Sequence, residues 1–289
     1  MSVDYLNYKQ EVNIADVDAL VSEIKAEVAM KKSENDLRLC LSSIDLTTLN
    51  STDQQSKGVN MAKKVSEFSS HYPSIDNVAA ICVYPTLVKV VRDNLKDKKI
   101  QIAAVAAGFP SSQTFIEVKV DECVRTVNAG ADEIDIVISL GTFLSGDHKT
   151  VFEEISNIKK SLGKTHLKVI LETGALPNYE SIRLASLIAM EAGADFIKTS
   201  TGKMEPAATL EAAAVMCLAI KDYYAKHKKK IGFKPAGGIV TPEEALGYLF
   251  VVRRILGEEW INSSLFRLGA SRLANNLLTE ITGKQVNYY

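Results

Sequence analysis

Apolar residues along the chain gather in short runs that alternate with longer segments of mixed polarity. Segments such as 114–129 and 178–192 have the length and composition of helices. Eight apolar runs predict strands, at 37–45, 78–85, 101–107, 133–139, 166–173, 195–201, 231–237 and 265–271. Strands and helices that alternate at this spacing predict parallel βαβ units. Eight repeats favour closure into a (β/α)8 TIM barrel over an open, doubly wound sheet.

An amphipathic helix is predicted ahead of the barrel. Its apolar positions, at helical spacing, are Ile14, Val17, Leu20, Val21, Ile24 and Val28. We expect this helix, over 14–30, to pack against the closed end of the barrel. No Pro-, Gly- or Ser-rich linker divides the 289 residues. The sequence therefore predicts one domain over 1–289, with a helical extension over 1–35 and a flexible C-terminal tail over 283–289.

Composition argues against several classes of partner. The formal net charge of −1 favours neither a nucleic acid nor a membrane surface. The polar start lacks a signal region, and no apolar run reaches the length of a membrane span. The basic run at 226–230 is explained better as a solvated helix end than as a site for an anionic partner. With four cysteines at unrelated spacings, Cys40, Cys82, Cys123 and Cys217, these features predict a cytoplasmic protein.

Charged residues interrupt the strands where both faces should be covered. The positions are Asp45, Asp135, Lys168, Lys198 and Lys234. Strands of a parallel barrel read as apolar runs, and a charge within the wall is costly unless it is paired or neutralised. One interpretation is a buried ion-pair network that only fixes strand register, and it stays open for Lys168 and Asp45 in particular. The other interpretation is a catalytic site.

Two of these lysines fit the chemistry of an amine nucleophile. Side-chain alternation allows Lys198 and Lys234 to point inward together from neighbouring strands about 4.8 Å apart. Like charge and burial both lower a lysine pKa, so one of the two would carry a free amine at neutral pH. A free amine is what a Schiff-base nucleophile requires. Asp135, across the barrel, would move protons as a general acid and base.

Glycine-containing turns follow the last three predicted strands. They lie at 200–203, 236–238 and 269–272, and Lys203 adds a cation to the first. Glycine lets backbone N–H groups approach an anion, and TIM barrels commonly bind phosphate after strands 7 and 8. Ordinary tight turns remain the alternative. The four histidines show no ligand spacing, so we expect no metal and no cofactor.

Seven segments resemble the 2-deoxyribose-5-phosphate aldolase family. They are IDLTTL (44–49), ICVYP (81–85), GADEIDIV (130–137), LKVILETG (167–174), GADFIKTSTGK (193–203), GFKPAGG (232–238) and FRLGAS (266–271). They occur in family order over nearly the whole predicted barrel, and the pair GADFIKTSTGK and GFKPAGG is highly specific. The resemblance implies a metal-independent class I aldolase that cleaves 2-deoxyribose 5-phosphate to glyceraldehyde 3-phosphate and acetaldehyde. It also implies a place in deoxyribonucleoside catabolism and allows a homodimer.

The resemblance also implies roles at matching positions. Lys198 matches the Schiff-base lysine, Lys234 the neighbour that lowers its pKa, and Asp135 the acid and base, with Asp45 and Lys168 in a proton relay. The phosphate pocket matches Thr201, Gly202, Lys203, Gly237, Gly238 and Ser271. Cys82 matches a pocket-lining cysteine, although a buried structural thiol is the alternative. Tyr289 matches a C-terminal tyrosine that folds over the site in some members, and a frayed terminus is the alternative.

The sequence departs from the family pattern at two places. Ser111 and Ser112 follow Phe109-Pro110 where a glycine is usual, and Arg272 replaces a second serine after Ser271. Arg272 could add a bidentate donor to a phosphate, or point elsewhere. Two other functions stay open beside the aldolase. One is another phosphate-binding barrel, such as a sugar-phosphate isomerase or a different Schiff-base aldolase, and the other is a non-catalytic barrel used for binding.

Overall fold

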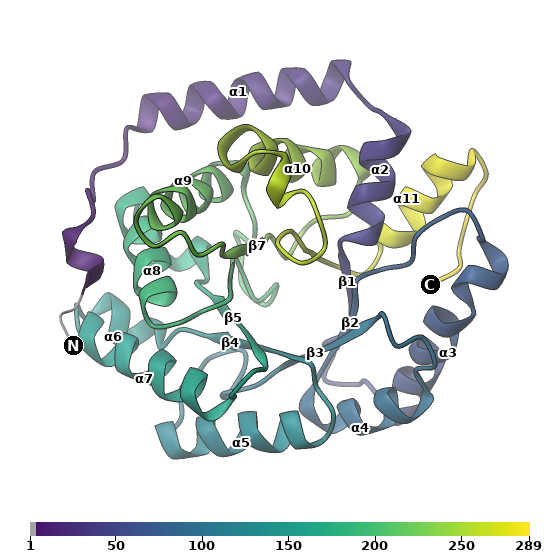
Figure 1. The fold of residues 1–289 in the computed structure, drawn as a ribbon, viewed down its shortest axis with the longest axis horizontal. Coiled ribbons are helices and arrows are strands. Elements are labelled where there is room, and N and C mark those ends of the chain that lie inside the picture. The colour runs from purple at the N-terminus through teal and green to yellow at the C-terminus, as the bar shows by residue number, and fades with distance from the viewer. Residues whose placement is uncertain (1–3) are drawn as a thin grey trace.

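Eight parallel strands form the centre of the computed structural model, which describes residues 4–289 (Figure 1). The strands are β1 Ile44–Thr47, β2 Ala80–Val83, β3 Gln101–Val105, β4 Glu133–Val137, β5 His166–Ile170, β6 Phe196–Lys198, β7 Gly232–Lys234 and β8 Leu268–Ala270. Their spatial order follows the chain from β1 to β7, with β8 beside β1. Backbone bridges between Phe233 and Phe266, and between Ala236 and Gly269, bring the two edges together. The predicted (β/α)8 barrel is confirmed.

Helices surround this barrel. They are α1 Ile14–Met30, α2 Glu34–Ser42, α3 Gln55–His71, α4 Pro85–Asn94, α5 Ile116–Asn128, α6 Leu140–Leu144, α7 His148–Ser161, α8 Tyr179–Glu191, α9 Leu210–His227, α10 Pro242–Leu256 and α11 Leu273–Thr282. Short 3₁₀ turns lie at Asp4–Asn7, Thr173–Ala175 and Glu258–Trp260. Within residues 4–289, none of the helices is both long and apolar enough to cross a bilayer.

The first strand differs from its prediction. The apolar run 37–45 predicts a strand, but residues up to Ser42 belong to helix α2. Ser33 caps this helix by accepting a hydrogen bond from the backbone N–H of Asp36 at 3.1 Å. Its buried residues Leu37, Cys40 and Leu41 follow a helical spacing. The cap and this spacing favour the helix, and β1 begins only at Ile44.

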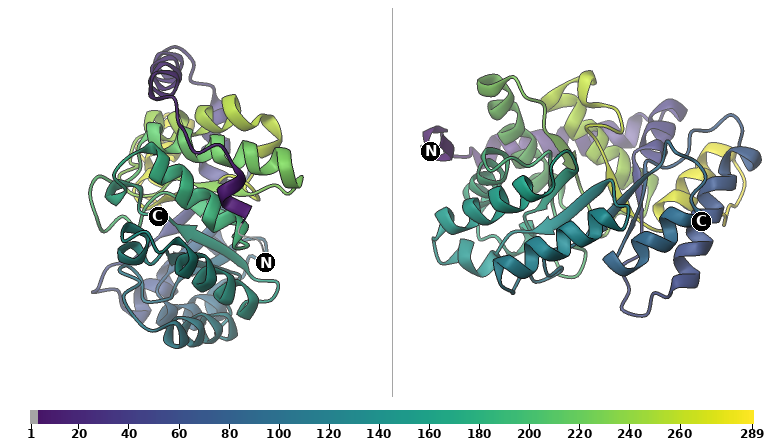
Figure 2. Two further views of the ribbon diagram at one scale, coloured as in Figure 1. Left: turned by 90° about the vertical axis from the view of Figure 1, so that its left-hand side faces the viewer. Right: turned by 60° about the horizontal axis from the view of Figure 1, so that its bottom comes forward.

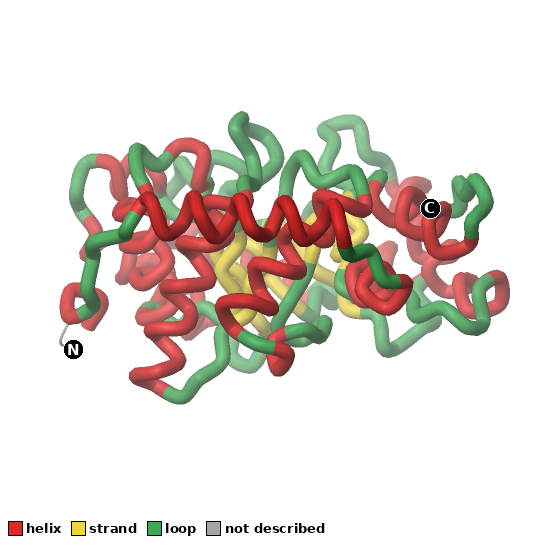
Figure 3. The backbone as a smooth tube through the Cα atoms, turned by 90° about the horizontal axis from the view of Figure 1, so that it is seen from above, coloured by secondary structure: helices red, strands yellow, loops and turns green. Residues whose placement is uncertain are grey.

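Helix α1 lies outside the ring of helices, not at the closed end of the barrel where we expected it. Figures 1 and 3 show it crossing the outer surface of α9 and α10, and the left view of Figure 2 shows it end-on beyond them. Val17, Val21 and Ile24 are its buried residues. Helix α10 is buried on nearly every side, because the barrel covers one face and α1 covers another. The extension predicted over 1–35 starts in residues 1–3, which lie outside the described part.

Two segments of similar sequence, NAGADEIDI at 128–136 and EAGADFIKT at 191–199, have the same local structure. In each, an aspartate placed just before a strand accepts a hydrogen bond from the backbone of a neighbouring strand. Asp132 accepts from Ile102 N at 2.8 Å, and Asp195 accepts from Leu167 N at 2.9 Å. These aspartates therefore fix the ends of strands.

The interior of the barrel has two unlike halves. Small apolar side chains from β2 and β3 form one half, namely Ala80, Cys82, Ala103 and Val105. Charged side chains from the other strands form the second half. Phe196 lies among them, with the amine of Lys168 5.8 Å from its ring centroid. Gly232 faces this ring so closely that a Cβ there would lie 2.2 Å from the Phe196 Cε1 atom. Small residues opposite large ones thus make room for a cluster of charges.

Candidate active site

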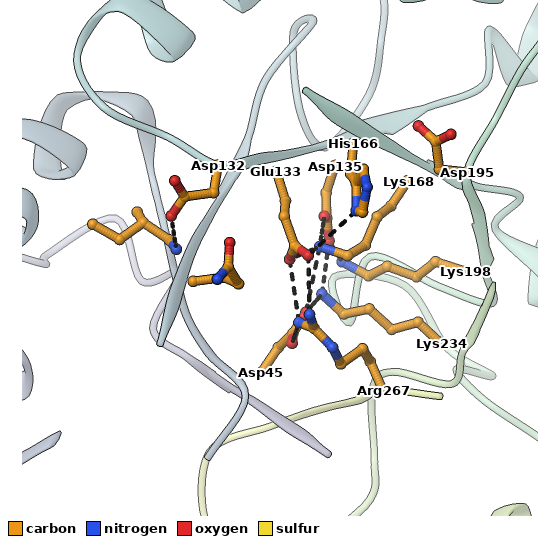
Figure 4. A network of polar contacts seen from close by, with 12 residues as sticks. Asp45, Asp132, Glu133, Asp135, His166, Lys168, Asp195, Lys198, Lys234 and Arg267 are labelled. Atoms are coloured by element: carbon orange, nitrogen blue, oxygen red, sulfur yellow. Dashed lines mark hydrogen bonds and ion pairs between the residues drawn. The ribbon is translucent and has the colours of Figure 1, made fainter. Parts of the chain in front are cut away.

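The five charged residues predicted from the strand pattern meet inside the barrel. Each is buried, with Lys198 the most accessible at 3%. Lys198 and Lys234 are register partners on β6 and β7, and the Nζ atoms of both lie 2.8 Å from Oδ2 of Asp135 on β4. Figure 4 shows the two lysines converging on this carboxylate. The alternation of side chains therefore brings both amines to one acceptor.

Asp45 and Lys168 extend this contact. Lys234 Nζ lies 2.5 Å from Asp45 Oδ2, so Lys234 bridges Asp45 and Asp135. Lys168 Nζ lies 3.3 Å from Asp135 Oδ1 and 3.7 Å from Asp45 Oδ2. Each of the two aspartates is thus shared between lysines, and removing Lys168 or Lys234 would leave two buried carboxylates underpaired.

Two further charged residues, which the sequence analysis missed, complete the cluster. Arg267, just ahead of β8, donates to Asp45 Oδ1 at 2.6 Å and to Glu133 Oε1 at 3.0 Å. Glu133 also pairs closely with Lys168. A signal for Glu133 was present, because it lies two residues before Asp135 and must share its side of β4. Arg267 carried a similar signal, since it stands between Phe266 and Leu268 in the apolar run predicted at 265–271. In the structure it lies just ahead of β8.

We call these seven residues the barrel charge network: Asp45, Glu133, Asp135, Lys168, Lys198, Lys234 and Arg267. When all are ionised, four positive groups face three negative ones, which leaves an excess of one positive charge in a buried site. Loss of one proton would balance the network. Lys198 is the lysine with the fewest carboxylate contacts, a single one to Asp135, so it is the group that gives up a proton most readily.

The pKa shifts of Lys198 and Lys234 agree with this count of charges. Burial is the main reason that the pKa of Lys198 is lowered, the positive charge of Lys234 lowers it further, and Asp135 opposes both. Burial also acts to lower the pKa of Lys234, but Asp135 and Asp45 outweigh it and raise that pKa above the ordinary range of a lysine. Lys198 is therefore the amine that is freed, and Lys234 keeps its charge.

Asp135 is held as a carboxylate. Burial acts to raise its pKa, but Lys168, Lys198 and Lys234 together bring it well below the ordinary value. A group with such a low pKa accepts a proton transiently and passes it on, and it does not store one at neutral pH.

A cavity of about 580 Å³ opens beside Lys198. It lies at the carboxyl ends of β1, β6, β7 and β8, and Lys198 is the member of the barrel charge network that lines it. Lys57, Lys203 and Arg272 line it as well, and no Asp or Glu is found among the described residues of its wall. An anionic molecule would thus meet cations at the mouth and an amine at depth.

The six residues expected to bind phosphate all line this cavity: Thr201, Gly202, Lys203, Gly237, Gly238 and Ser271. The glycines adopt positive φ angles of 74°, 89° and 79° at Gly202, Gly237 and Gly238. At Gly237 a Cβ would also come within 2.7 Å of the Cβ of Ala207. Glycine adopts this backbone conformation readily, and the conformation leaves backbone N–H groups accessible to an anion.

Glu172 supports this pocket from behind, and the sequence analysis did not single it out. Its carboxylate accepts from the Thr201 backbone N–H at 3.0 Å and from the Thr201 hydroxyl at 2.6 Å. It is buried, and its φ of 54° is unusual for a residue with a side chain. This strain at the end of β5 points to a conformation required by the site.

Two cations border the pocket from different loops. Lys203 donates from Nζ to the backbone oxygen of Leu49, and thereby spans the cavity from β6 to β1. Arg272 lies at the start of α11 and lines the same cavity, which favours the first of its two predicted alternatives.

Cys82 does not line the cavity. Its thiol is fully buried against the small residues of β2 and β3, and burial raises its pKa. A buried structural thiol therefore describes it better than a pocket-lining group.

Tyr289 lines the rim of the cavity, beside helix α3. Its hydroxyl donates to Asn77 Oδ1 at 2.6 Å, and its ring stacks on Phe68 at a centroid distance of 5.6 Å. The neighbouring Tyr288 donates to the backbone oxygen of Lys64 at 2.6 Å. Figure 1 shows this end of the chain between α11 and α3. The tail is thus seated at the edge of the site in this structure.

Other features noted in the sequence lie away from the cavity. Ser111 and Ser112 line a separate space of about 150 Å³. The basic run 226–230 lies at the end of α9, where Lys230 pairs with Glu259 at 2.6 Å. Among the residues described, no group of three or more His, Cys, Asp and Glu side chains is arranged to hold a metal ion.

Comparison with known proteins agrees with this geometry. A family model described as DeoC/LacD family aldolase matches residues 39–249. The chain belongs to this family. Relatives of this DeoC/LacD family aldolase match most of its length. One from Caenorhabditis elegans is 45% identical over 260 residues, covering 89% of this chain and 86% of the relative. The human protein named deoxyribose-phosphate aldolase is 39% identical over 298 residues, covering 97% of this chain and 93% of its own length.

Solved structures share the fold of this family member. The aldolase QR15 is 30% identical with a TM-score of 0.68, and the match covers 84% of this chain and 96% of QR15. A tetrameric deoxyribose phosphate aldolase from Aeropyrum pernix has a TM-score of 0.68 at 23% identity, covering 89% of this chain and 96% of its own. The similarity to the Aeropyrum pernix protein shows a shared fold alone.

Proposed function

We propose that this aldolase reversibly cleaves 2-deoxyribose 5-phosphate to glyceraldehyde 3-phosphate and acetaldehyde through a Schiff base on Lys198. One observation carries the proposal: a lysine with a lowered pKa lies at the bottom of a cavity whose described charged wall residues are all cationic. The amine supplies a nucleophile for an aldehyde, and the cations supply a site for a phosphate. The names of the relatives in worm, mouse and man add support for this substrate.

The first step is addition of the amine. The neutral Nζ of Lys198 attacks the C1 aldehyde carbon of the open-chain sugar, and loss of water gives an iminium ion. The iminium restores the positive charge at the position of Nζ, 2.8 Å from Asp135 Oδ2 in the free enzyme. The ionised Asp135 stabilises that cation, because the carboxylate is already in place and needs no reorganisation.

Carbon–carbon cleavage follows. A base removes the proton of the C3 hydroxyl, the C2–C3 bond breaks, and its electron pair moves into the iminium to give a neutral enamine. Glyceraldehyde 3-phosphate leaves. The excess positive charge of the barrel charge network favours this step, since the electrons move toward it. Protonation of the enamine at C2, followed by hydrolysis, releases acetaldehyde and frees Lys198. Asp135, between Lys198 and Lys234, is positioned to relay these protons.

The phosphate group would be held at the cavity mouth. The glycine backbone after β6 and β7, the hydroxyls of Thr201 and Ser271, and the cations Lys203 and Arg272 are all on its wall. Charge-assisted hydrogen bonds of this kind fix the substrate and point its aldehyde end toward Lys198.

Borohydride trapping tests the proposal. The enzyme is incubated with 2-deoxyribose 5-phosphate, with and without borohydride, and glyceraldehyde 3-phosphate release is measured in the presence of a chelator. We expect a covalent adduct at Lys198 by peptide mass spectrometry, and loss of both adduct and turnover in Lys198→Ala. An adduct on Lys234 would reverse the roles of the two lysines. Turnover without any adduct would exclude the Schiff base.

A substrate panel separates the alternatives. Another Schiff-base aldolase would prefer a different donor over acetaldehyde in the reverse direction, and a sugar-phosphate isomerase would release no two-carbon product. A non-catalytic barrel would bind the sugar phosphate without turning it over.

Three further expectations stand as proposals. We propose a homodimer, on family resemblance alone, which sedimentation velocity would test against a monomer or tetramer. We propose a cytoplasmic location, supported by four buried free cysteines, and imaging of the full chain would test it. We propose a single cooperative domain over 1–289, supported by the continuous hydrophobic core, with one unfolding transition as the expected result.

A further inference from the structure

Arg267 lies just ahead of β8 and is 5% exposed. It is absent from the cavity wall, so a substrate in that cavity would not touch it. Its guanidinium reaches Asp45 Oδ1 at 2.6 Å and both Glu133 oxygens at 3.0 and 3.2 Å. Such a group is charged at every accessible pH, so Arg267 contributes a fixed positive charge to the barrel charge network.

We propose that Arg267 is a positioning residue that supplies the excess positive charge by which the barrel charge network disfavours a protonated Lys198. This rests on the proposed function only in assigning Lys198 a role, because the charge argument holds for any chemistry at that amine. Without Arg267, the three lysines would face three carboxylates. The charges would then balance only if Lys198 were protonated.

The path from Arg267 to Lys198 runs through alternating charges. Arg267 pairs with Asp45, Asp45 pairs with Lys234 at 2.5 Å, and Lys234 shares Asp135 with Lys198. A second path runs through Glu133 and Lys168 to Asp135. Arg267 therefore occupies Asp45 and Glu133, which would otherwise be free to compensate the positive charges of Lys234 and Lys168. Less compensation of those lysines leaves a stronger repulsion at Lys198.

Other titratable groups lie near Lys198 or its partners. The groups facing it or its partners are Cys82 on β2, Lys203 in the cavity wall, and His166, whose Nδ1 lies 3.9 Å from Glu133 Oε1. His166 has an exposed side chain, at 55%, so water screens its interaction with Glu133. Burial remains the largest cause of the lowered pKa of Lys198. In this proposal Arg267 adds its positive charge to that of Lys234, which lowers the pKa of Lys198 directly.

Four variants test whether the pKa of Lys198 shifts in the direction expected from charge. Arg267→Met removes the positive charge and should raise the pKa of Lys198, by about one unit for a nearby charge. Glu133→Gln removes a negative charge and should lower it. The double variant has the net charge of the parent and should return close to the parent value. Arg267→Lys keeps the charge with a different shape, and should also stay close to the parent.

The readout is competitive labelling of lysine amines by acetic anhydride across a pH series, quantified at the Lys198 peptide by mass spectrometry. It reports the fraction of free amine whether or not the protein turns over deoxyribose 5-phosphate, so a failure of the proposed function stays distinguishable. The pH profile of kcat/KM is measured in parallel. Thermal melting of each variant reports folding.

The opposite directions separate a charge role from a structural one. A loss of packing would shift Arg267→Met and Glu133→Gln the same way, and that result would overturn the proposal. An unchanged labelling midpoint in folded Arg267→Met would overturn it as well. If Arg267→Met fails to fold, Glu133→Gln and the double variant decide: a downward shift in the first and a return in the second support the proposal, and no shift in either refutes it.

Discussion

Lys198 and Lys234 are direct register partners on adjacent strands, and their amines lie at the same distance, 2.8 Å, from a single carboxylate oxygen. The pKa values of the two lysines nonetheless shift in opposite directions. Lys234 has a second carboxylate partner, Asp45, at 2.5 Å, and Lys198 has no second one among the described residues. The difference between a nucleophile and a permanent cation thus comes from one extra ion pair.

Lys234→Leu should move catalysis to higher pH. A positive neighbour that lowers the pKa of Lys198 is lost, so that pKa rises toward the ordinary value of about 10.4. At a pH below the new pKa, the free-amine fraction falls about tenfold for each unit of the rise. The pH dependence of kcat/KM measures the shift. Lys230→Leu, which removes a lysine paired with Glu259, is the matched control and should leave the profile unchanged. An unaltered profile in Lys234→Leu would count against the lysine pair.

Glu172→Gln should weaken binding of the phosphate end. The carboxylate accepts two hydrogen bonds from Thr201, and an amide can accept only one while presenting a donor to the other. We expect KM for 2-deoxyribose 5-phosphate to rise about tenfold, the effect of losing about 1.4 kcal/mol. The kinetics of unphosphorylated deoxyribose should change little. Glu280→Gln, at a partly exposed ion pair, is the control. An equal loss with both sugars would place Glu172 elsewhere in the mechanism.

Gly232→Ala should destabilise the barrel. The added Cβ would lie 2.2 Å from the Phe196 ring, which fills the interior and has little room to move. Overpacking of this kind costs about 1–3 kcal/mol, measurable as a lower free energy of unfolding in urea. Gly141→Ala is the comparison, because its Cβ would have only an ordinary contact at 3.8 Å in helix α6. Equal stability of the two variants would contradict the close-packing argument.

Asp45→Asn should reduce stability at neutral pH by about 3–5 kcal/mol, the effect of breaking a buried ion pair. The pKa of Asp45 is lowered in the folded protein by Lys234, Arg267 and Lys168, in spite of burial. Its folded pKa therefore lies below its unfolded value of about 3.9. The stabilisation is fully present above about pH 5 and declines as the pH falls through that value toward the folded pKa.

The gap in unfolding free energy between parent and Asp45→Asn should accordingly narrow on acidification. Urea unfolding at several acidic pH values measures it. Asp93→Asn, at an exposed pair with Lys89, should show a small and nearly constant gap. A gap at Asp45 that widens at low pH would reverse the sign of the argument.

The sequence predicted the barrel and the inward lysines because both depend on strand periodicity. Asp135, Lys198 and Lys234 belong to strands and directly follow apolar residues, so a charge there is conspicuous. Arg267 and Glu172 lie in the apolar runs predicted at 265–271 and 166–173, although the observed strands β8 and β5 leave them out. Only their hydrogen-bond partners in the structure show what these two residues do. The error at 37–45 arose because Leu37, Leu39 and Leu41 fit a strand, while Leu37, Cys40 and Leu41 fit the helix that the cap at Ser33 selects.

Helix α1 has a practical consequence for anyone seeking a minimal barrel. Its buried residues Val17, Val21 and Ile24 lie on the face that packs against the outer surface of α9 and α10. Trimming the chain to start at α2 would expose that surface to water while leaving the catalytic cavity, on other elements, intact. The shortened enzyme should retain its chemistry in dilute solution and precipitate as it is concentrated.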